Sequence, residues 1–359
     1  MRILALDIGV GTCDILLYDS GRTLENCTRM VLPSPTRLLA AEFRSAAKSA
    51  GQGGVFVHGH TVGGGPFARA VTRALAAGVE VYMTPAAALS IRNNLEDVVS
   101  MGIRIVEKPP PGFSGATMAA DELDLRPMVD FLARHGEALD DLECVAVAVQ
   151  DHGVYAPGES NRKTRLRHMR ERLEKDPRPT ALALLSHEVP DAFPRLSSAA
   201  RRAGEQFPSS RVMVMDTAPA AVAGCLSDPR LEALCGGNVL VINAGNGHTL
   251  ACILAGGRVV GVLEHHTHRL EPMAFARYLR LFCDGRARDE DPFMAEGHGL
   301  FYLGEPPGWE ALELVAVTGP NRGMLEGTGL ELYYPAPGGD MMMTGPMGLV
   351  RAYLERFGR

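Results

Sequence analysis

The sequence predicts an α/β protein with two domains, and three observations support this. The chain has 359 residues, more than one compact core usually holds. Short apolar segments bounded by glycine or turn residues alternate with longer helical stretches, as in α/β proteins. A meander of three strand-like segments occurs near the N-terminus and again after residue 237, each time followed by further helices and strands.

The first half of the chain opens with three closely spaced strand candidates. They cover residues 2–7, 13–19 and 24–31, and Asp19-Ser20-Gly21 is a turn, so an antiparallel meander is expected. Further strands are predicted at 54–58, 79–83, 103–107, 143–149 and 211–215. Helices are predicted between them, at 36–49, 66–77 and 122–136.

The second half repeats this order of elements. Strand candidates at 238–244, 249–255 and 258–263 form its meander, and Gly256-Gly257 joins the last two. Then follow a helix near 271–283, strands at 313–318 and 329–334, and a helix at 345–357. A boundary within 228–238 gives domains of residues 1–235 and 236–359.

Composition excludes several classes of protein. The net charge of −6 argues against a general nucleic-acid binder, which needs a basic surface. No apolar run reaches the roughly 18 residues of a membrane span, and Asp7 interrupts the apolar N-terminal segment, so a cytoplasmic protein without a membrane partner is expected. None of the seven cysteines forms CxxC or CxxxCxxC, so local spacing builds no zinc knuckle or iron–sulfur site.

The most informative segment is Asp7-Ile8-Gly9-Val10-Gly11-Thr12, which follows an apolar strand. Gly9 and Gly11 lack a Cβ, so backbone N–H groups can converge on phosphate oxygens. Thr12 could add a hydroxyl donor, and Asp7 could bind Mg²⁺ through water. A plain β-hairpin turn is the alternative interpretation.

A second segment has a similar pattern. Asn243-Ala244-Gly245-Asn246-Gly247-His248-Thr249 also follows an apolar strand and opens a meander, and Asn243 lies 236 residues after Asp7. We expect Asn243, Gly245, Gly247, His248 and Thr249 to contribute to binding a nucleotide. The two segments could hold its phosphates from opposite sides.

Together the two segments resemble the actin-like ATPase superfamily, which includes sugar kinases, acetate kinases, heat-shock chaperones and actin. There, such segments are the phosphate-1 and phosphate-2 loops of two ribonuclease-H-like domains. The resemblance implies two ribonuclease-H-like α/β domains with a nucleotide cleft between them, and ATP and Mg²⁺ as cofactors. Asn243 stands where ATPases of the superfamily often have aspartate, which could remove a ligand for metal-bound water.

The resemblance also implies an adenosine loop and a substrate loop. Gly319, Asn321 and Arg322 follow a late strand in the position of the adenosine loop, although Pro320 departs from the usual Gly-Gly. Gln150-Asp151-His152-Gly153 resembles the Gln-x-His-Gly substrate loop of sugar kinases, with Gln150 and His152 on the substrate.

Two aspartates compete for the role of catalytic base. Asp216 ends an apolar strand and is followed by small residues, which resembles the sugar-kinase base, but it is also a good helix N-cap. Asp151 follows another buried strand, at the end where α/β proteins place ligands.

Histidines suggest other uses. His58, His60, His265 and His266 follow or end strands, and we expect them to line the cleft as substrate contacts. Imidazoles at strand ends could instead assemble a zinc or iron site, although no HxxxH or HExxH spacing places a pair on one helix.

The sequence therefore favours a Mg-ATP-binding phosphotransferase of sugar-kinase type acting on a small hydroxylated acceptor. A slow ATPase that remodels or reactivates a partner enzyme is the first alternative, with the basic segment 161–178 as its docking surface. A histidine-based metal hydrolase is the second, and a homo-oligomer is compatible with each. The chain is also identified as a member of a family labelled pyruvate formate-lyase-activating enzyme, although the missing CxxxCxxC argues against that chemistry.

Overall fold

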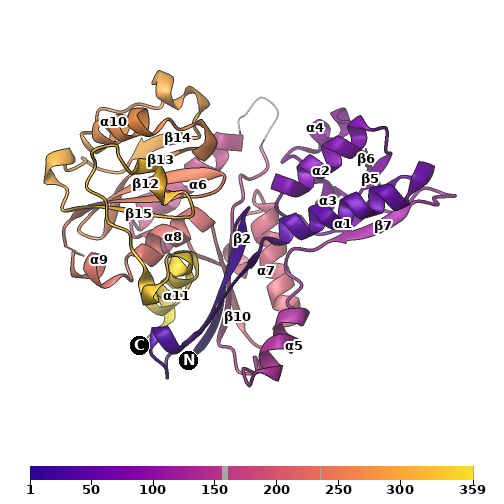
Figure 1. Ribbon diagram of the computed structural model, residues 1–359, viewed down its shortest axis with the longest axis horizontal. Helices are drawn as coiled ribbons and strands as arrows, with labels where there is room; N and C mark the ends of the chain where they lie inside the picture. The colour runs from indigo at the N-terminus through magenta and orange to yellow at the C-terminus, as the bar shows by residue number, and fades with distance from the viewer. Residues whose placement is uncertain (156–160, 235, 359) are drawn as a thin grey trace.

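The computed structural model describes residues 1–155, 161–234 and 236–358 and contains three β-sheets. Sheet A, with six strands, lies in the middle of the molecule as seen in Figure 1. Sheet C, with five strands, and its helices lie on one side, and sheet B, with four strands, lies on the other.

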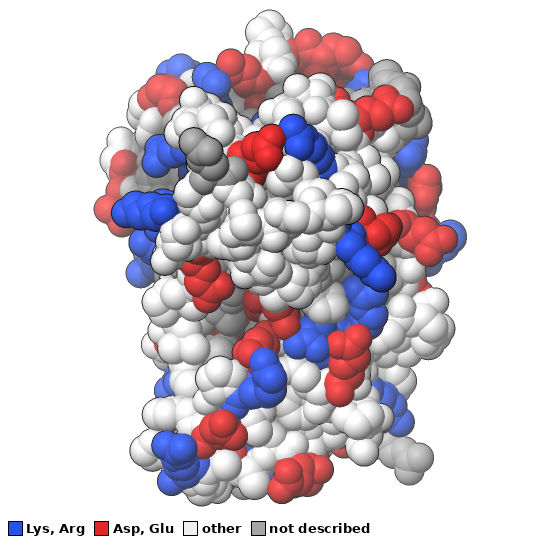
Figure 2. Space-filling model, turned by 90° about the vertical axis from the view of Figure 1, so that its right-hand side faces the viewer, with Lys and Arg blue, Asp and Glu red and all other residues white. Residues whose placement is uncertain are grey.

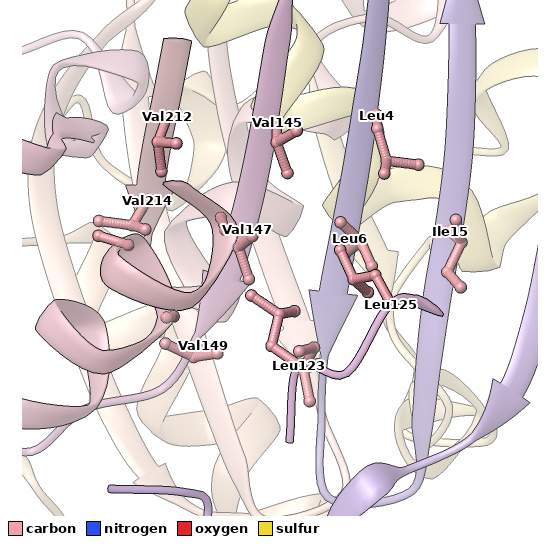
Figure 3. Packing of buried hydrophobic residues seen from close by; sticks show 14 of the residues in the cluster. Leu4, Leu6, Ile15, Leu123, Leu125, Val145, Val147, Val149, Val212 and Val214 are labelled. Carbon is pink, nitrogen blue, oxygen red and sulfur yellow. The ribbon is translucent and has the colours of Figure 1, made fainter. Parts of the chain in front are cut away.

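Sheet A contains the first predicted meander. Its strands are β1 (Arg2–Ile8), β2 (Thr12–Asp19), β3 (Thr28–Pro33), β8 (Cys144–Val149), β9 (Leu184–Leu185) and β10 (Arg211–Met215). Their order is β3-β2-β1-β8-β10-β9, with β1 antiparallel to β2 and parallel to β8. Figure 3 shows side chains of β1, β8 and β10 on one face of this sheet, where they form a buried core with Leu123 and Leu125.

Sheet C repeats this arrangement with the second meander. Its strands are β11 (Asn238–Ala244), β12 (His248–Ala255), β13 (Arg258–His266), β14 (Gly299–Tyr302) and β15 (Leu314–Thr318). Their order is β14-β13-β12-β11-β15, with β11 antiparallel to β12 and parallel to β15. The strand orders β3-β2-β1-β8 and β13-β12-β11-β15 are therefore equivalent. This is the ribonuclease-H-like arrangement, present twice, so the predicted fold class is confirmed.

Sheet B and its helices form an additional α/β layer, which the chain makes after β3 and before β8. Its strands are β4 (Val55–Gly59), β5 (Val81–Met83), β6 (Arg104–Ile105) and β7 (Ala116–Ala120), all parallel. Helices α1 (Pro35–Ser49), α2 (Gly65–Ala76), α3 (Pro85–Ala88) and α4 (Leu95–Ser100) accompany it, with a separate apolar core. The sequence predicted strands here but no second sheet in the first half.

The remaining helices lie around sheets A and C (Figure 1). They are α5 (Arg126–Arg134), α6 (Asn161–Lys175), α7 (Pro194–Gln206), α8 (Thr217–Cys225), α9 (Pro229–Ala233), α10 (Pro272–Cys283) and α11 (Thr344–Phe357). The strand predicted at 329–334 is wrong, because only Tyr333 pairs there, in an isolated bridge with Ala316.

Helices α8 and α11 connect the two halves. Helix α8 follows a strand of sheet A but packs Val222 and Cys225 into the core of sheet C, whereas α11, at the C-terminus, packs Val350 on sheet A. The helices cross closely, since a Cβ on Gly224 would collide with the carbonyl of Thr344, and one on Gly348 with that of Ala220. The boundary at residues 235/236 stays a prediction.

The surface carries both signs of charge. Figure 2 shows Lys and Arg interspersed with Asp and Glu over the face turned toward the viewer, which is consistent with the small net charge. Among the helices that the structure describes, none combines the length and apolar character needed to cross a bilayer.

Candidate functional site

A cavity of about 880 Å³ lies where the two halves and the additional layer meet. Its wall includes the turn between β1 and β2, the turn between β11 and β12, the start of α2, and the loop at Gly319 and Pro320. Most of the predicted phosphate-binding residues thus line one cavity, although the two turns that carry them are more than 200 residues apart in the chain.

The first turn is held by its own backbone and by the start of α1. The N–H of Gly9 donates to the carbonyl of Thr12 at 2.9 Å. The Ser34 hydroxyl donates to the Gly9 carbonyl at 2.6 Å, and the Ser34 N–H donates to the Gly11 carbonyl at 3.1 Å. The turn is therefore anchored on both sides.

The second turn repeats this geometry. The N–H of Gly245 donates to the carbonyl of His248 at 3.0 Å, the bond that Gly9 makes with Thr12. His248 thus stands at the position of Thr12. Thr249 is one residue further on, where it is fully buried and its hydroxyl lies 3.0 Å from that of Thr267, and it is not among the cavity-lining residues that the structure describes. Phosphate binding by the Thr249 side chain is therefore not supported.

The two turns face each other. A Cβ on Gly11 would collide with the side-chain amide of Asn246, and one on Gly247 would lie 3.9 Å from Val10 Cγ2. This close approach favours glycine at position 11, because a Cβ there would force the Asn246 side chain to move.

Two aspartates face each other at the carboxyl end of β1. Asp7 and Asp14 are directly paired in the register of β1 and β2. Burial and the neighbouring Asp14 and Asp216 carboxylates raise the pKa of Asp7 well above its usual range, and burial raises the pKa of Asp14 to about 7. One oxygen of each carboxyl group is buried without a hydrogen-bond partner in the described structure. Since Mg²⁺ prefers oxygen ligands, these groups and the nearby Asn243 fit a magnesium ion.

The predicted adenosine loop supports the second turn. Gly319 has φ +92°, and a Cβ there would lie 2.5 Å from the Ala244 carbonyl oxygen. The Asn321 side chain donates to the Gly245 carbonyl at 2.9 Å. Arg322 lies over the Tyr334 ring and does not belong to the described cavity wall. Gly319 and Pro320 line the cavity, while Asn321 holds the turn, and adenosine binding by this loop stays a prediction.

Asp216 is part of a buried ionic triad. Arg165, on α6, donates to both carboxylate oxygens of Asp216 at 2.6 Å and forms a short ion pair with Glu264 of β13. Burial lowers the pKa of Arg165, but its two acidic partners together raise the pKa by a larger amount, so the net shift is upward. The Asp216 carboxylate also accepts from the Ala218 N–H at 3.2 Å, as the N-cap of α8. The predicted N-cap role is confirmed, whereas the role of base stays a prediction for an already engaged carboxylate.

Asp151 is likewise engaged. Its carboxylate accepts from the N–H groups of Gly153, Arg195 and Leu196 at 2.7–3.1 Å, which fixes the start of α7. Burial raises its pKa, while these backbone bonds oppose the rise. A catalytic role of Asp151 stays a prediction, and its contacts are those of a structural cap.

The predicted histidines divide into two groups. His152, His248 and His266 line the cavity. His58 is exposed, His60 lies 2.9 Å from Arg201, and His265 bonds to the carbonyl of Phe293, and none of these belongs to the described cavity wall. Substrate binding in this cavity by the latter group is therefore not supported.

Neighbouring contacts define the chemistry of the histidine group. Gln150 lies at 2.9 Å from His248 Nδ1 through its carbonyl oxygen and at 3.5 Å from Glu264 through its amide nitrogen. Burial, followed by the nearby cationic groups, lowers the pKa of His152 to about 3 and that of His248 to about 2. Both rings are therefore neutral at physiological pH.

Sequence reasoning missed three features of the site. Arg165 lies in the basic segment 161–178, which the sequence suggested as a docking surface, but it is buried in the triad. Leu166, Met169 and Leu173 of the same helix are also buried. Arg69 and Arg73, one turn apart on α2, line the cavity. The Arg195 guanidinium pairs with Glu122 at 2.7 Å beneath the loop before α2. Only the i, i+4 spacing of the α2 arginines was visible in the sequence.

A family model described as "Putative pyruvate format-lyase activating enzyme (DUF1786)" matches residues 62–324, more than half of the chain. The chain belongs to this family. The family's description names an activating enzyme, but the six cysteines that the structure describes are buried and free, and none is in the described group of residues that could hold a metal ion.

Comparison with curated proteins gives no match. Among solved structures, an inorganic polyphosphate/ATP-glucomannokinase from Arthrobacter sp. is similar at 16% identity, covering 99% of this chain and 97% of that one, with a TM-score of 0.34. A PilM–PilN type IV pilus biogenesis complex is similar at 13% identity, covering 98% of each chain, with a TM-score of 0.39. The activator of 2-hydroxyisocaproyl-CoA dehydratase from Clostridium difficile, with bound ADPNP, is similar at 10% identity. The match covers 99% of this chain and 95% of that one, with a TM-score of 0.34. The fold is identified by the strand orders of sheets A and C, not by these distant likenesses.

Proposed function

We propose that this protein binds Mg²⁺-ATP in the cavity and transfers the terminal phosphoryl group to a small acceptor that carries both a hydroxyl and a negative charge. The observation that carries the proposal is the pair of equivalent turns. Gly9 and Gly245 make the same backbone bond, and the turns face each other across sheets A and C. Turns of this kind bind phosphate oxygens through backbone N–H groups.

The acidic pair at the carboxyl end of β1 is assigned to the cation. Asp7 and Asp14 have buried oxygens without partners, and a bound Mg²⁺ would neutralise charge on the transferring phosphoryl group. The Asp7 carboxylate lies against Gly345 of α11, so closely that a Cβ on Gly345 would collide with it. The strand and the helix together thus fix the position of this carboxylate.

The acceptor is assigned to the part of the cavity beside α2. Arg69 and Arg73 line this wall, and neither has a carboxylate partner among the described residues. Two unpaired guanidinium groups one helical turn apart suit a phosphate or carboxylate group of the acceptor. The neutral His152, which lines the same cavity, would contact the acceptor hydroxyl.

A slow ATPase is the second candidate, and the state of the two aspartates favours it. Asp216 is held by Arg165 and Asp151 by three N–H groups, so every oxygen of the two carboxylates already accepts a hydrogen bond. With water in place of an acceptor, the same cavity would hydrolyse ATP slowly. Such a protein would act through closure of its two halves on a partner.

ADP release in the presence of neutral and anionic hydroxylated compounds tests the assignment. We expect anionic acceptors to stimulate release, and Arg73→Ala to lower kcat/KM for the acceptor by about ten- to a hundredfold, the value of a lost charge-assisted hydrogen bond. Arg44→Ala, which replaces an exposed arginine of α1 outside the described cavity wall, is the matched control. ATP hydrolysis that no acceptor stimulates would instead support the ATPase.

A further inference from the structure

Three histidines meet at one edge of sheet C. His248 begins β12 and is paired with His266, the last residue of β13. His298 directly precedes β14, and its N–H donates to the carbonyl of Glu264 at 2.9 Å. Three adjacent strands therefore place one imidazole each at the same end of the sheet, which no local sequence spacing reveals.

The imidazoles are close enough to share an ion. One ring nitrogen from each of the three lies within 4.8 Å of the others. The ring centroid of His298 is 4.5 Å from that of His248 and 4.4 Å from that of His266. Nitrogens about 2 Å from a common ion in tetrahedral geometry are separated by roughly 3–4 Å, so small adjustments would complete the site.

Buried nitrogen atoms here lack partners. His298 is only 7% exposed, and neither of its ring nitrogens has a hydrogen-bond partner in the described structure. His152 stacks on His298 at 5.1 Å, and its Nδ1 is also buried and without a partner. Burying polar atoms without partners is costly, and a metal ion bound by His298 would satisfy one of its two ring nitrogens.

Supporting contacts orient one of the rings. The Gln150 carbonyl oxygen lies 2.9 Å from His248 Nδ1, and the Gln150 amide is directed to Glu264. A bond at Nδ1 leaves Nε2 available, which is how most histidine ligands of metals are held. Glu264 is fixed in turn by Arg165.

We propose that His248, His266 and His298 bind a divalent transition-metal ion, with Zn²⁺ as the best fit. Imidazole nitrogens suit zinc, iron, nickel and copper, whereas Mg²⁺ prefers oxygen. Three protein ligands leave a position open, and His248 and His266 line the cavity, so an oxygen atom of a molecule bound there can complete the coordination. This site is distinct from the carboxylates of Asp7 and Asp14, and the proposal does not depend on nucleotide binding.

Titration of the chelator-treated, full-length protein with Zn²⁺, and with Co²⁺ as a spectroscopic probe, tests the site. We expect one equivalent per chain, a cobalt absorption band typical of nitrogen ligands, and no competition from excess Mg²⁺. His298→Ala and His266→Ala should each weaken Zn²⁺ binding by about a hundredfold or more, at least the effect of losing a supporting residue. His187→Ala, at an exposed histidine outside the cluster, should not change it.

The polar variant His298→Asn guards against misfolding of the alanine variants, and circular dichroism checks each fold. Absence of stoichiometric zinc in the wild type would overturn the proposal. Equal affinity in the wild type and a folded His298 variant would also overturn it, because the ion would then be held elsewhere. Displacement by Mg²⁺ would exclude the assigned class of metal.

Discussion

Replacing Arg165 with methionine is expected to lower the free energy of unfolding by about 3–5 kcal/mol, since it leaves buried carboxylates without their counter-ion. The guanidinium is 2% exposed and donates to both oxygens of Asp216 and to Glu264. Asp216 belongs to the end of sheet A and Glu264 to β13 of sheet C, so one side chain of α6 bridges both halves. Denaturant unfolding at neutral pH measures the effect.

Arg170→Met is the matched control, because Arg170 is on the same helix but is 54% exposed, and its ion pair within the described part of the chain is with Glu174. The control should lose less than about 1 kcal/mol, as is usual for an exposed pair. Similar losses in the two variants would show that the buried triad contributes no more to stability than a surface ion pair.

Replacing Gly345 with alanine is expected to weaken Mg²⁺-ATP binding by at least about tenfold, or 1.4 kcal/mol. Gly345 lies in the first turn of α11, and an added Cβ would collide with the carboxylate of Asp7. Asp7 is on a central strand of a buried sheet, so its backbone cannot easily move. Either the Asp7 carboxylate must rotate away from residue 345 or α11 must shift. Either movement disturbs the proposed cation site.

Gly204→Ala provides the control for this substitution. Gly204 is also helical, in α7, but a Cβ there would meet only Val212 Cγ2 at 3.8 Å. It should leave nucleotide affinity unchanged and slightly stabilise the helix. Unchanged affinity in a folded Gly345→Ala protein, measured by calorimetric titration, would argue that Asp7 has no part in binding the cation.

Local patterns in the sequence were sufficient for much of the fold. Alternating apolar residues and glycine-containing turns marked both meanders, because hairpin chemistry depends on adjacent residues. The segment at 329–334 resembles the meander strands in composition, but of its residues only Tyr333 pairs with a strand, in a single bridge to Ala316. Strand propensity alone does not supply a partner.

The site was predicted less completely, because much of it depends on contacts between distant segments. The two glycine turns were recognised from their shared pattern, yet the position of Thr12 is taken by His248 and not by Thr249. The engagement of Asp216 by Arg165 joins residues 51 positions apart, and in the sequence Arg165 is one of several basic residues of segment 161–178. The histidine cluster follows from strand register in sheet C, which the spacing of histidines in the sequence does not reveal.

Calorimetric titration with Mg²⁺-ATP, comparing the wild type with Gly245→Val, tests the paired-turn site most directly. A Cβ at Gly245 would lie 2.8 Å from the His248 carbonyl oxygen, so valine would distort the second turn without touching the first. The account predicts micromolar binding to the wild type and a loss of at least about a hundredfold, or 2.7 kcal/mol, in the folded variant. Absence of binding to the wild type at millimolar nucleotide, or equal affinity in both proteins, would contradict it.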